Sequence, residues 1–193
     1  MKIPLRFQIT EFDCGTVALQ NAISYLYDRE NVPAELIRAI SIYTVNCYDE
    51  RGNISESGVT RDVMENMTVW IDNFLGQCHF GLDCRRFVGE SINLEEIKNC
   101  VDDRGCVLFK TYRNGEEHFV IITMMDADFL YIWDSYYLGE TYYDTERKIS
   151  IIFNKPFHYN RKVSIDRFVD ERAKDFALGP VNEREVLLFK KMF

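Results

Sequence analysis

Residues 106–134 of the chain read CVLFKTYRNGEEHFVIITMMDADFLYIWD. The runs 106–112, 118–125 and 129–134 within it are rich in β-branched and aromatic residues, which favour extended strands. An Asn-Gly pair at 114–115 separates the first two runs, and an Asp-Ala-Asp sequence separates the last two. Both separators are typical of hairpin turns, so the pattern predicts three consecutive strands paired antiparallel.

The chain before these strands has a helical period instead. Apolar residues recur three and four positions apart over residues 14–27, 33–43 and 59–74, which predicts three helices. Their expected buried faces consist of Leu19, Ala22, Ile23 and Leu26 in the first, Leu36, Ile37, Ile40 and Tyr43 in the second, and Val59, Val63, Met67, Ile71 and Phe74 in the third.

Residues with known positional preferences stand at the ends of these segments. We expect Asp13 to be the N-cap of the first helix, Pro33 to open the second and Gly76 to end the third. Residues 50–57 are predicted to form a polar loop. The sequence Asn93-Leu94-Glu95-Glu96 resembles a capping box, so it predicts a short fourth helix.

The last third of the chain contains two further apolar runs. They predict strands over 149–153 and 185–190, with a helix over 165–176 between them. Helices followed by an antiparallel sheet are typical of the α+β class. We therefore expect one α+β domain over residues 1–193, with a helical part over about 8–104 and a sheet part over about 105–193.

Composition and charge exclude several classes of protein. Apolar residues make up 47% of the 193 residues and charged residues 28%, which is ordinary for a globular chain and argues against disorder, collagen or coiled coil. The net charge of -8 argues against nucleic acid as a partner. Residues 1–12 lack the apolar core of a signal peptide and no apolar run could span a membrane, so we expect a cytoplasmic location. The oligomeric state is left open.

The chain contains six cysteines, for which three interpretations are possible. In a reducing compartment most cysteines are small buried hydrophobes rather than disulfide partners. A zinc site is the second interpretation, although the pairs Cys78/Cys84 and Cys100/Cys106 are spaced more widely than zinc ligands usually are, and His79 lies beside Cys78. The third is that one cysteine is a nucleophile. The full set is Cys14, Cys47, Cys78, Cys84, Cys100 and Cys106.

Cys14 is the best candidate for a nucleophile. It lies in the predicted first turn of a helix, where free backbone N–H groups and the helix dipole stabilise a thiolate. Gly15 follows it, so we expect the backbone beside the sulfur to be open to a substrate. His118 begins a predicted strand and Asp134 ends the next strand of the same hairpin, so the two should share one edge as a base and the carboxylate that orients it.

Gln8 is the fourth candidate, because its side-chain amide could donate a hydrogen bond to an oxyanion beside the N-terminus of the helix. Residues 8–19, QITEFDCGTVAL, resemble the Q-x-x-x-x-D-C-G-x-x-x-L motif of the bacteriocin-processing cysteine peptidases, peptidase family thirty-nine of the papain-like superfamily. The segment from His118 to Asp134 resembles that family's second motif. The family usually has Pro after the Asp, whereas this chain has Ser135.

The resemblance implies a papain-like fold with Cys14 as nucleophile, His118 as base, Asp134 as orienting residue and Gln8 as oxyanion donor, and no cofactor or metal. It implies a bacterial cysteine peptidase or amidohydrolase that acts on a peptide or amide, with a double-glycine leader as the suggested substrate. An acyltransferase or amide-forming enzyme of a biosynthetic pathway would use the same acyl-enzyme. A catalytically silent binding module and a structural zinc protein are two further hypotheses.

Overall fold

The computed structural model describes residues 1–44, 58–78 and 80–192. The predicted polar loop over 50–57, together with Cys47 and His79, lies outside these residues. The elements follow in the order α1 (Cys14–Leu26), η1 (Arg29–Asn31), α2 (Ala34–Tyr43), α3 (Arg61–Cys78), β1 (Leu82–Val88), η2 (Gly89–Ser91), α4 (Leu94–Asp102), β2 (Cys106–Arg113), β3 (Glu116–Met125), β4 (Phe129–Trp133), β5 (Ile149–Ile151), β6 (Arg161–Ser164), α5 (Ile165–Phe168), η3 (Val181–Glu183) and β7 (Glu185–Lys191).

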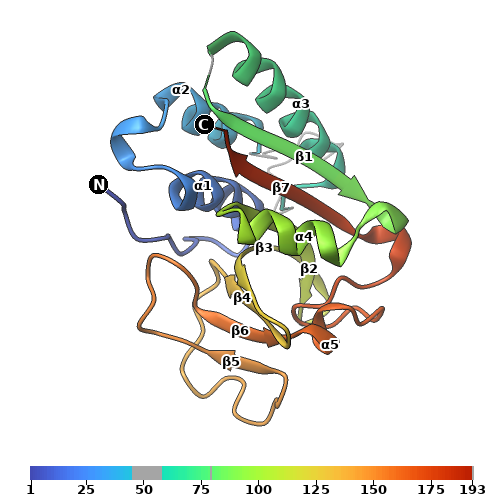
Figure 1. Ribbon diagram of the computed structural model, residues 1–193. Coiled ribbons are helices and arrows are strands. Elements are labelled where there is room, and N and C mark those ends of the chain that lie inside the picture. Colours follow the sequence, from blue (N-terminus) through green and yellow to red (C-terminus); the bar gives the residue numbers. More distant parts are fainter. Residues whose placement is uncertain (45–57, 79, 193) are drawn as a thin grey trace, which may run out of the picture.

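All the strands belong to one seven-stranded sheet of order β1-β7-β2-β3-β4-β6-β5, and every neighbouring pair is antiparallel. Side chains of α1, α2 and α3 form one apolar cluster with the sheet, and side chains of α4 and α5 form a second. Figure 1 shows α1, α2 and α3 gathered near the β1–β7 end, with β4, β6 and β5 extending away from them. This mixed architecture confirms the predicted α+β class.

The three-stranded unit of β2, β3 and β4 forms as the sequence predicts. Asn114 and Gly115 both have positive φ, 52° and 85°, and connect Arg113 to its cross-strand partner Glu116 in a two-residue hairpin. The second turn is held by Asp126, whose carboxylate accepts hydrogen bonds from the N–H groups of Asp128 and Phe129. Local turn chemistry therefore accounts for both connections.

The first four helices are close to prediction, with differences at their ends. Pro33 is the N-cap residue of α2 rather than its first helical residue, and Asn93 caps α4 by accepting a hydrogen bond from the N–H of Glu95. Tyr43 was expected to be buried, but it is 55% exposed and lies against the Trp70 ring. Helix α3 continues past Gly76 to Cys78, so this glycine does not end the helix.

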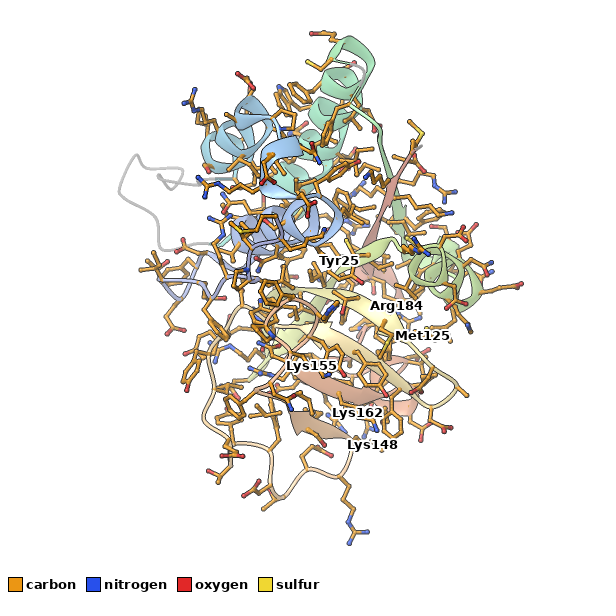
Figure 2. All side chains as sticks on the ribbon, turned by 60° about the vertical axis from the view of Figure 1, so that its left-hand side comes forward. Tyr25, Met125, Lys148, Lys155, Lys162 and Arg184 are labelled. Carbon is orange, nitrogen blue, oxygen red and sulfur yellow. The ribbon has the colours of Figure 1, made fainter. Side chains whose placement is uncertain are left out.

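Three elements differ from the sequence prediction. The helix expected over 165–176 is only α5, because the following segment leaves the helix to pair with the end of β2, where Phe176 N–H donates to the carbonyl of Tyr112. Strand β1 lies inside the expected helical part and forms an edge of the sheet. Strand β6 was not predicted either, because its largely polar sequence has no strand pattern. The ammonium of Lys162, which is labelled in Figure 2, lies 3.8 Å from the centroid of the Phe129 ring.

Candidate active site

The Cys14 thiol lies at the N-terminus of α1 and is 6% exposed. Asp13 occupies the N-cap position, but its side chain does not cap the helix. Its carboxylate accepts a hydrogen bond from the N–H of Thr10 instead, 3.1 Å away. Asp13 therefore shapes the turn that leads into α1, and the N–H groups of the first helical turn are left without this side-chain acceptor.

Gly15 has a different role from the one that its sequence position suggests. A Cβ atom at this residue would lie 2.6 Å from Cγ2 of Val59 and 3.3 Å from the Phe119 ring. The glycine is buried, so the expected opening toward a substrate is wrong at this residue. Its lack of a side chain lets the start of α1 pack closely against Val59 and β3.

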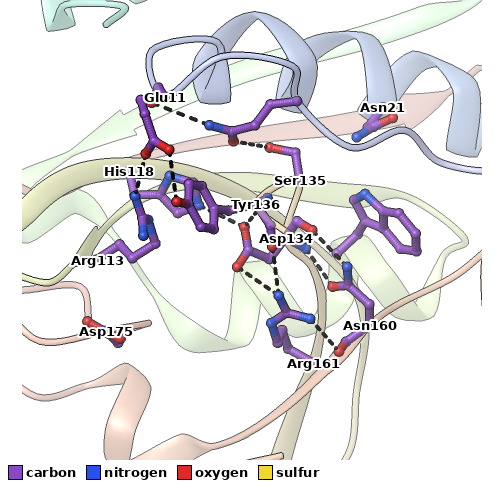
Figure 3. A network of polar contacts seen from close by, with 12 residues as sticks. Glu11, Asn21, Arg113, His118, Asp134, Ser135, Tyr136, Asn160, Arg161 and Asp175 are labelled. Carbon is purple, nitrogen blue, oxygen red and sulfur yellow. Dashed lines mark hydrogen bonds and ion pairs between the residues drawn. The ribbon is translucent and has the colours of Figure 1, made fainter. Parts of the chain in front are cut away.

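His118 lies in β3 and Asp134 directly follows β4, and the two side chains meet at one edge of the hairpin (Figure 3). The Nε2 atom of His118 lies 2.8 Å from Oδ1 of Asp134. Both side chains are buried, His118 at 4% and Asp134 at 0% exposure. Because Nε2 is engaged by the carboxylate, Nδ1 is the ring nitrogen left to interact with the thiol of Cys14.

Burial opposes ionisation of the Cys14 thiol, but the hydrogen bond to His118 and the charge of that ring outweigh burial, so the pKa of the thiol lies below its ordinary value. The backbone N–H groups of Phe119 and Gly15 act in the same direction. Burial also opposes the charged form of His118, yet the Asp134 carboxylate raises the pKa of His118 to about 10. The arrangement favours a thiolate beside an imidazolium.

The hydrogen bonds of the Gln8 side chain within the described residues go to groups other than the Cys14 thiol. Its Nε2 donates to the carbonyls of Thr10, 2.9 Å away, and Glu11, 3.3 Å away, while its Oε1 accepts from the hydroxyl of Ser135. The side chain thus connects the turn before Cys14 to the residue after Asp134. Its amide protons are engaged by carbonyls that belong to this same turn.

Two residues around Asp134 were missed by sequence reasoning. The Asn160 side chain accepts from the Asp134 N–H and donates to the Asp134 carbonyl, at 2.8 and 2.7 Å. A guanidinium nitrogen of Arg161 lies 3.4 Å from Oδ2 of Asp134. No motif marks them, because Asn160 precedes and Arg161 begins β6, a strand that the sequence pattern does not predict.

A cleft of about 480 Å³ opens beside Cys14 and His118. One wall carries Glu11 and Arg113, whose side chains are paired at 3.1 Å. The full lining consists of Glu11, Phe12, Cys14, Gly58, Val59, Thr60, Arg61, Arg113, Glu116, Glu117, His118 and Phe119. The thiol and the imidazole are therefore at the edge of a space large enough for a few residues of an extended peptide.

The remaining described cysteines lie in different environments. Burial raises the pKa of Cys100 to about 11 and raises the pKa values of Cys84 and Cys106 well above the ordinary range. Cys78 is exposed at the end of α3, so it is not a core thiol. Over residues 1–44, 58–78 and 80–192, no three His, Cys, Asp or Glu side chains are grouped as a metal site. No helix in the same part of the chain is long and apolar enough to cross a membrane.

Comparison with known proteins finds solved structures that are similar to this chain in fold. No protein-family model matches the sequence, and no curated protein matches it. A solved structure of a double glycine motif protease from an AMS/PCAT transporter, in complex with the leader peptide, is 14% identical, covers 99% of this chain and 93% of its own, and has a TM-score of 0.46. A protein described as a C39-like peptidase from Bacillus anthracis is 13% identical, covers 100% of this chain and 96% of its own, and has a TM-score of 0.50.

The helices packed on an antiparallel sheet, in the arrangement of the Bacillus anthracis structure, define the fold as that of the papain-like cysteine peptidases. More particularly, it is the fold of the C39-type peptidases. This likeness is one of fold, since 13% of the residues are identical.

Proposed function

We propose that this protein is a cysteine peptidase or amidohydrolase in which Cys14 is the nucleophile, His118 the general base and acid, and Asp134 the residue that orients the imidazole. The observation that carries the proposal is the placement of Cys14 at the N-terminus of α1 and of the Asp134-bound His118 ring in the lining of one cleft. Among the buried cysteines of the described residues, Cys14 is the one whose thiol pKa is shifted downward.

The proposed reaction has two stages. The Cys14 thiolate attacks the carbonyl carbon of an amide, and the tetrahedral intermediate collapses to a thioester as the His118 imidazolium gives its proton to the leaving amine. A water molecule then attacks the thioester, His118 removes the proton of that water, and the carboxylic acid leaves as the thiol is restored. Asp134 stays ionised throughout and stabilises the imidazolium.

Backbone groups beside the sulfur are suited to stabilise the oxyanion that forms at the attacked carbonyl. The N–H groups of Gly15 in α1 and Phe119 in β3 are near enough to the sulfur to help lower the pKa of the Cys14 thiol. Gln8 is the proposed side-chain donor, and this role requires its Nε2 to exchange the carbonyls of Thr10 and Glu11 for the substrate oxygen. Hydrogen bonds at such sites often tighten only when the substrate is bound.

Alkylation tests the nucleophile without knowledge of the natural substrate. Limiting iodoacetamide at neutral pH, followed by peptide mapping, should label Cys14 before any other cysteine, since only the thiolate reacts. His118→Ala should slow the labelling of Cys14. The exposed Cys78 is the internal control, because its labelling should be unchanged. Faster labelling of Cys78 than of Cys14 would overturn the proposal.

Acyl transfer is the outcome that separates the peptidase from the alternative enzyme. An activated p-nitrophenyl ester of a short peptide should acylate Cys14, and the adduct should be visible in the intact protein mass. Release of the free acid in the presence of a low concentration of a primary amine supports hydrolysis. Predominant formation of the amide would instead show that the thioester is resolved by transfer.

A further inference from the structure

Asp134 is held in place partly by residues at the start of a strand that lies on the far side of β4 from His118. Strand β6 pairs with β4, and the residue before it, Asn160, binds both the N–H and the carbonyl of Asp134 through its side-chain amide. The N–H of Tyr136 also donates to Oδ1 of Asp134, 2.8 Å away. These contacts fix the backbone and one carboxylate oxygen, so the orientation of Asp134 toward His118 is determined before a substrate binds (Figure 3).

Arg161 is the second residue of this support, and it carries a charge. Its side chain is 2% exposed, and its guanidinium donates to the carbonyls of Asn160 and Tyr136, at 3.0 and 2.8 Å. These two bonds hold the group beside Oδ2 of Asp134, at 3.4 Å. Within the described residues, Nε of Arg161 and Oδ2 of Asp134 have no hydrogen bond of ordinary geometry, so the pair interacts mainly through charge.

The effect of the Arg161 charge follows from the net charge of four buried groups taken together. A thiolate, an imidazolium, the Asp134 carboxylate and the Arg161 guanidinium together are neutral. Without Arg161, the same reactive form has a net charge of about minus one in a low-dielectric site, and one more proton, on the thiol, would make it neutral. Arg161 therefore favours the form in which the Cys14 thiol has lost its proton.

Other charged or titratable groups face this cluster and belong to the same balance. Tyr136 lies edge-on to the His118 ring, and its hydroxyl donates to Glu11, which is paired with Arg113. Tyr143 lies near Asp134 and Arg161, and its hydroxyl donates to Asp175. Glu11 and Arg113 neutralise each other, and burial together with Asp175 keeps Tyr143 in its neutral form because both raise the pKa of that phenol. Arg161 remains the cation that opposes Asp134 on the side away from His118.

On this geometry, and resting on the proposed function of Cys14, His118 and Asp134, we propose that Arg161 is a positioning residue that sets the pH at which the Cys14 thiolate forms. Asn160 is its uncharged counterpart and controls only the orientation of Asp134. Arg161 touches no reacting atom. It acts on the sulfur through the Asp134 carboxylate and the His118 ring.

The test is the rate of Cys14 alkylation by iodoacetamide as a function of pH in the wild type, Arg161→Gln, Arg161→Lys and Asn160→Ala. Arg161→Gln should move the midpoint of the rise upward by roughly one pH unit, so labelling below the new midpoint slows roughly tenfold. Arg161→Lys keeps the charge, so its midpoint should lie close to that of the wild type. Asn160→Ala should slow turnover of the peptide ester while the midpoint stays near that of the wild type.

Arg167→Gln is the matched control, because Arg167 is another largely buried arginine and pairs with Glu146 rather than with Asp134. It should leave the midpoint unchanged. If Arg161→Gln does not fold, as judged by circular dichroism, Arg161→Met keeps the apolar stem and takes its place. A midpoint unchanged in these charge-removing variants would overturn the inference while the proposed function stands. A wild type whose Cys14 does not react at all would overturn the proposed function itself.

Discussion

Burial alone does not decide which cysteine ionises. Cys14, Cys100 and Cys106 are all buried, yet the pKa of the thiol is lowered only at Cys14. The difference lies in the partners, because Cys14 has the His118 ring beside it, whereas the Cys100 and Cys106 thiols donate to backbone carbonyls, which disfavour a thiolate. A helix N-terminus and an imidazole together are the reason why this thiol is the proposed nucleophile.

The proposed role of Gln8 as oxyanion donor can be tested by replacing this single residue. If Gln8 donates to the oxyanion, Gln8→Ala should lower kcat for the peptide ester by roughly 10²–10³ with little change in KM. The measurement is steady-state turnover beside thermal unfolding. Gln20→Ala is the control, because Gln20 lies in α1 and its amide donates to the Ser41 hydroxyl, away from the cleft. A lower melting temperature with kcat unchanged would mean that Gln8 only holds the turn before Cys14.

At the scale of elements, a β-bulge determines that His118 and Asp134 can meet. Near the turn, Met125 pairs with Leu130, and that register would place Asp134 opposite Ile121. The register shifts between Ile122 and Met124, so Ile121 pairs with Trp133 and Asp134 falls opposite Val120. His118 and Val120 lie on the same face of β3, and a one-residue slip would exchange the faces.

The extra residue of this bulge is Thr123, and its hydroxyl donates to the carbonyl of His158, 2.7 Å away. The bulge is thereby tied to the segment that leads into β6, where Asn160 precedes the strand and Arg161 begins it. The hairpin turn predicts that His118 and Asp134 share an edge, whereas the bulge determines that they share a face.

The packing of α1 on β3 gives a prediction for Gly15. Gly15→Ala places a methyl group 2.6 Å from Cγ2 of Val59 and should lower the free energy of unfolding by about 1–3 kcal/mol, with loss of Cys14 reactivity as α1 moves. Adding Val59→Ala to Gly15→Ala should recover part of the lost stability and part of the lost Cys14 reactivity, because it removes the Val59 methyl group that the new alanine would meet. Equilibrium urea unfolding and iodoacetamide labelling measure the two effects.

Gly76→Ala is the matched control for this substitution. Gly76 lies inside α3, and a methyl group added there would have no atom within 4 Å, so alanine should raise the free energy of unfolding by about 0.5–1 kcal/mol through helix propensity. If Gly15→Ala behaved like Gly76→Ala, the close approach of α1 to Val59 would not be a constraint on the fold.

At the scale of the whole molecule, the buried ionised groups couple stability to pH. In the wild type, the proposed thiolate–imidazolium pair of the folded state would bind as many protons as a neutral cysteine and histidine in the unfolded chain. The lowered pKa of Cys14 and the raised pKa of His118 then cancel in their effect on stability near neutral pH. Cys14→Ala removes this cancellation. Asp134 still raises the pKa of His118 above its ordinary 6.5, so the folded state then binds the extra proton above that pH.

The stabilisation from His118 in Cys14→Ala should therefore be complete below pH 6.5 and be lost as the pH rises toward the folded pKa of His118. The slope should approach about 1.4 kcal/mol per pH unit. Urea unfolding at intervals between about pH 6 and 9 measures it, with Cys14→Ala/His118→Ala as the reference. Parallel curves for the two variants would contradict a charged, buried His118.

The sequence by itself determined the α+β class, the helix that begins at Cys14, the β2–β3–β4 unit and the candidates Cys14, His118 and Asp134. These depend on local chemistry, namely helical period, turn residues and helix ends, which a short window of sequence contains. Only the tertiary structure decided the bulge at Thr123, the packing role of Gly15 and the support of Asp134 by Asn160 and Arg161. These features depend on strand register or on contacts between residues that are distant along the chain. A buried arginine has no signature in the neighbouring sequence, because its burial is made possible by the groups that it contacts in the folded protein.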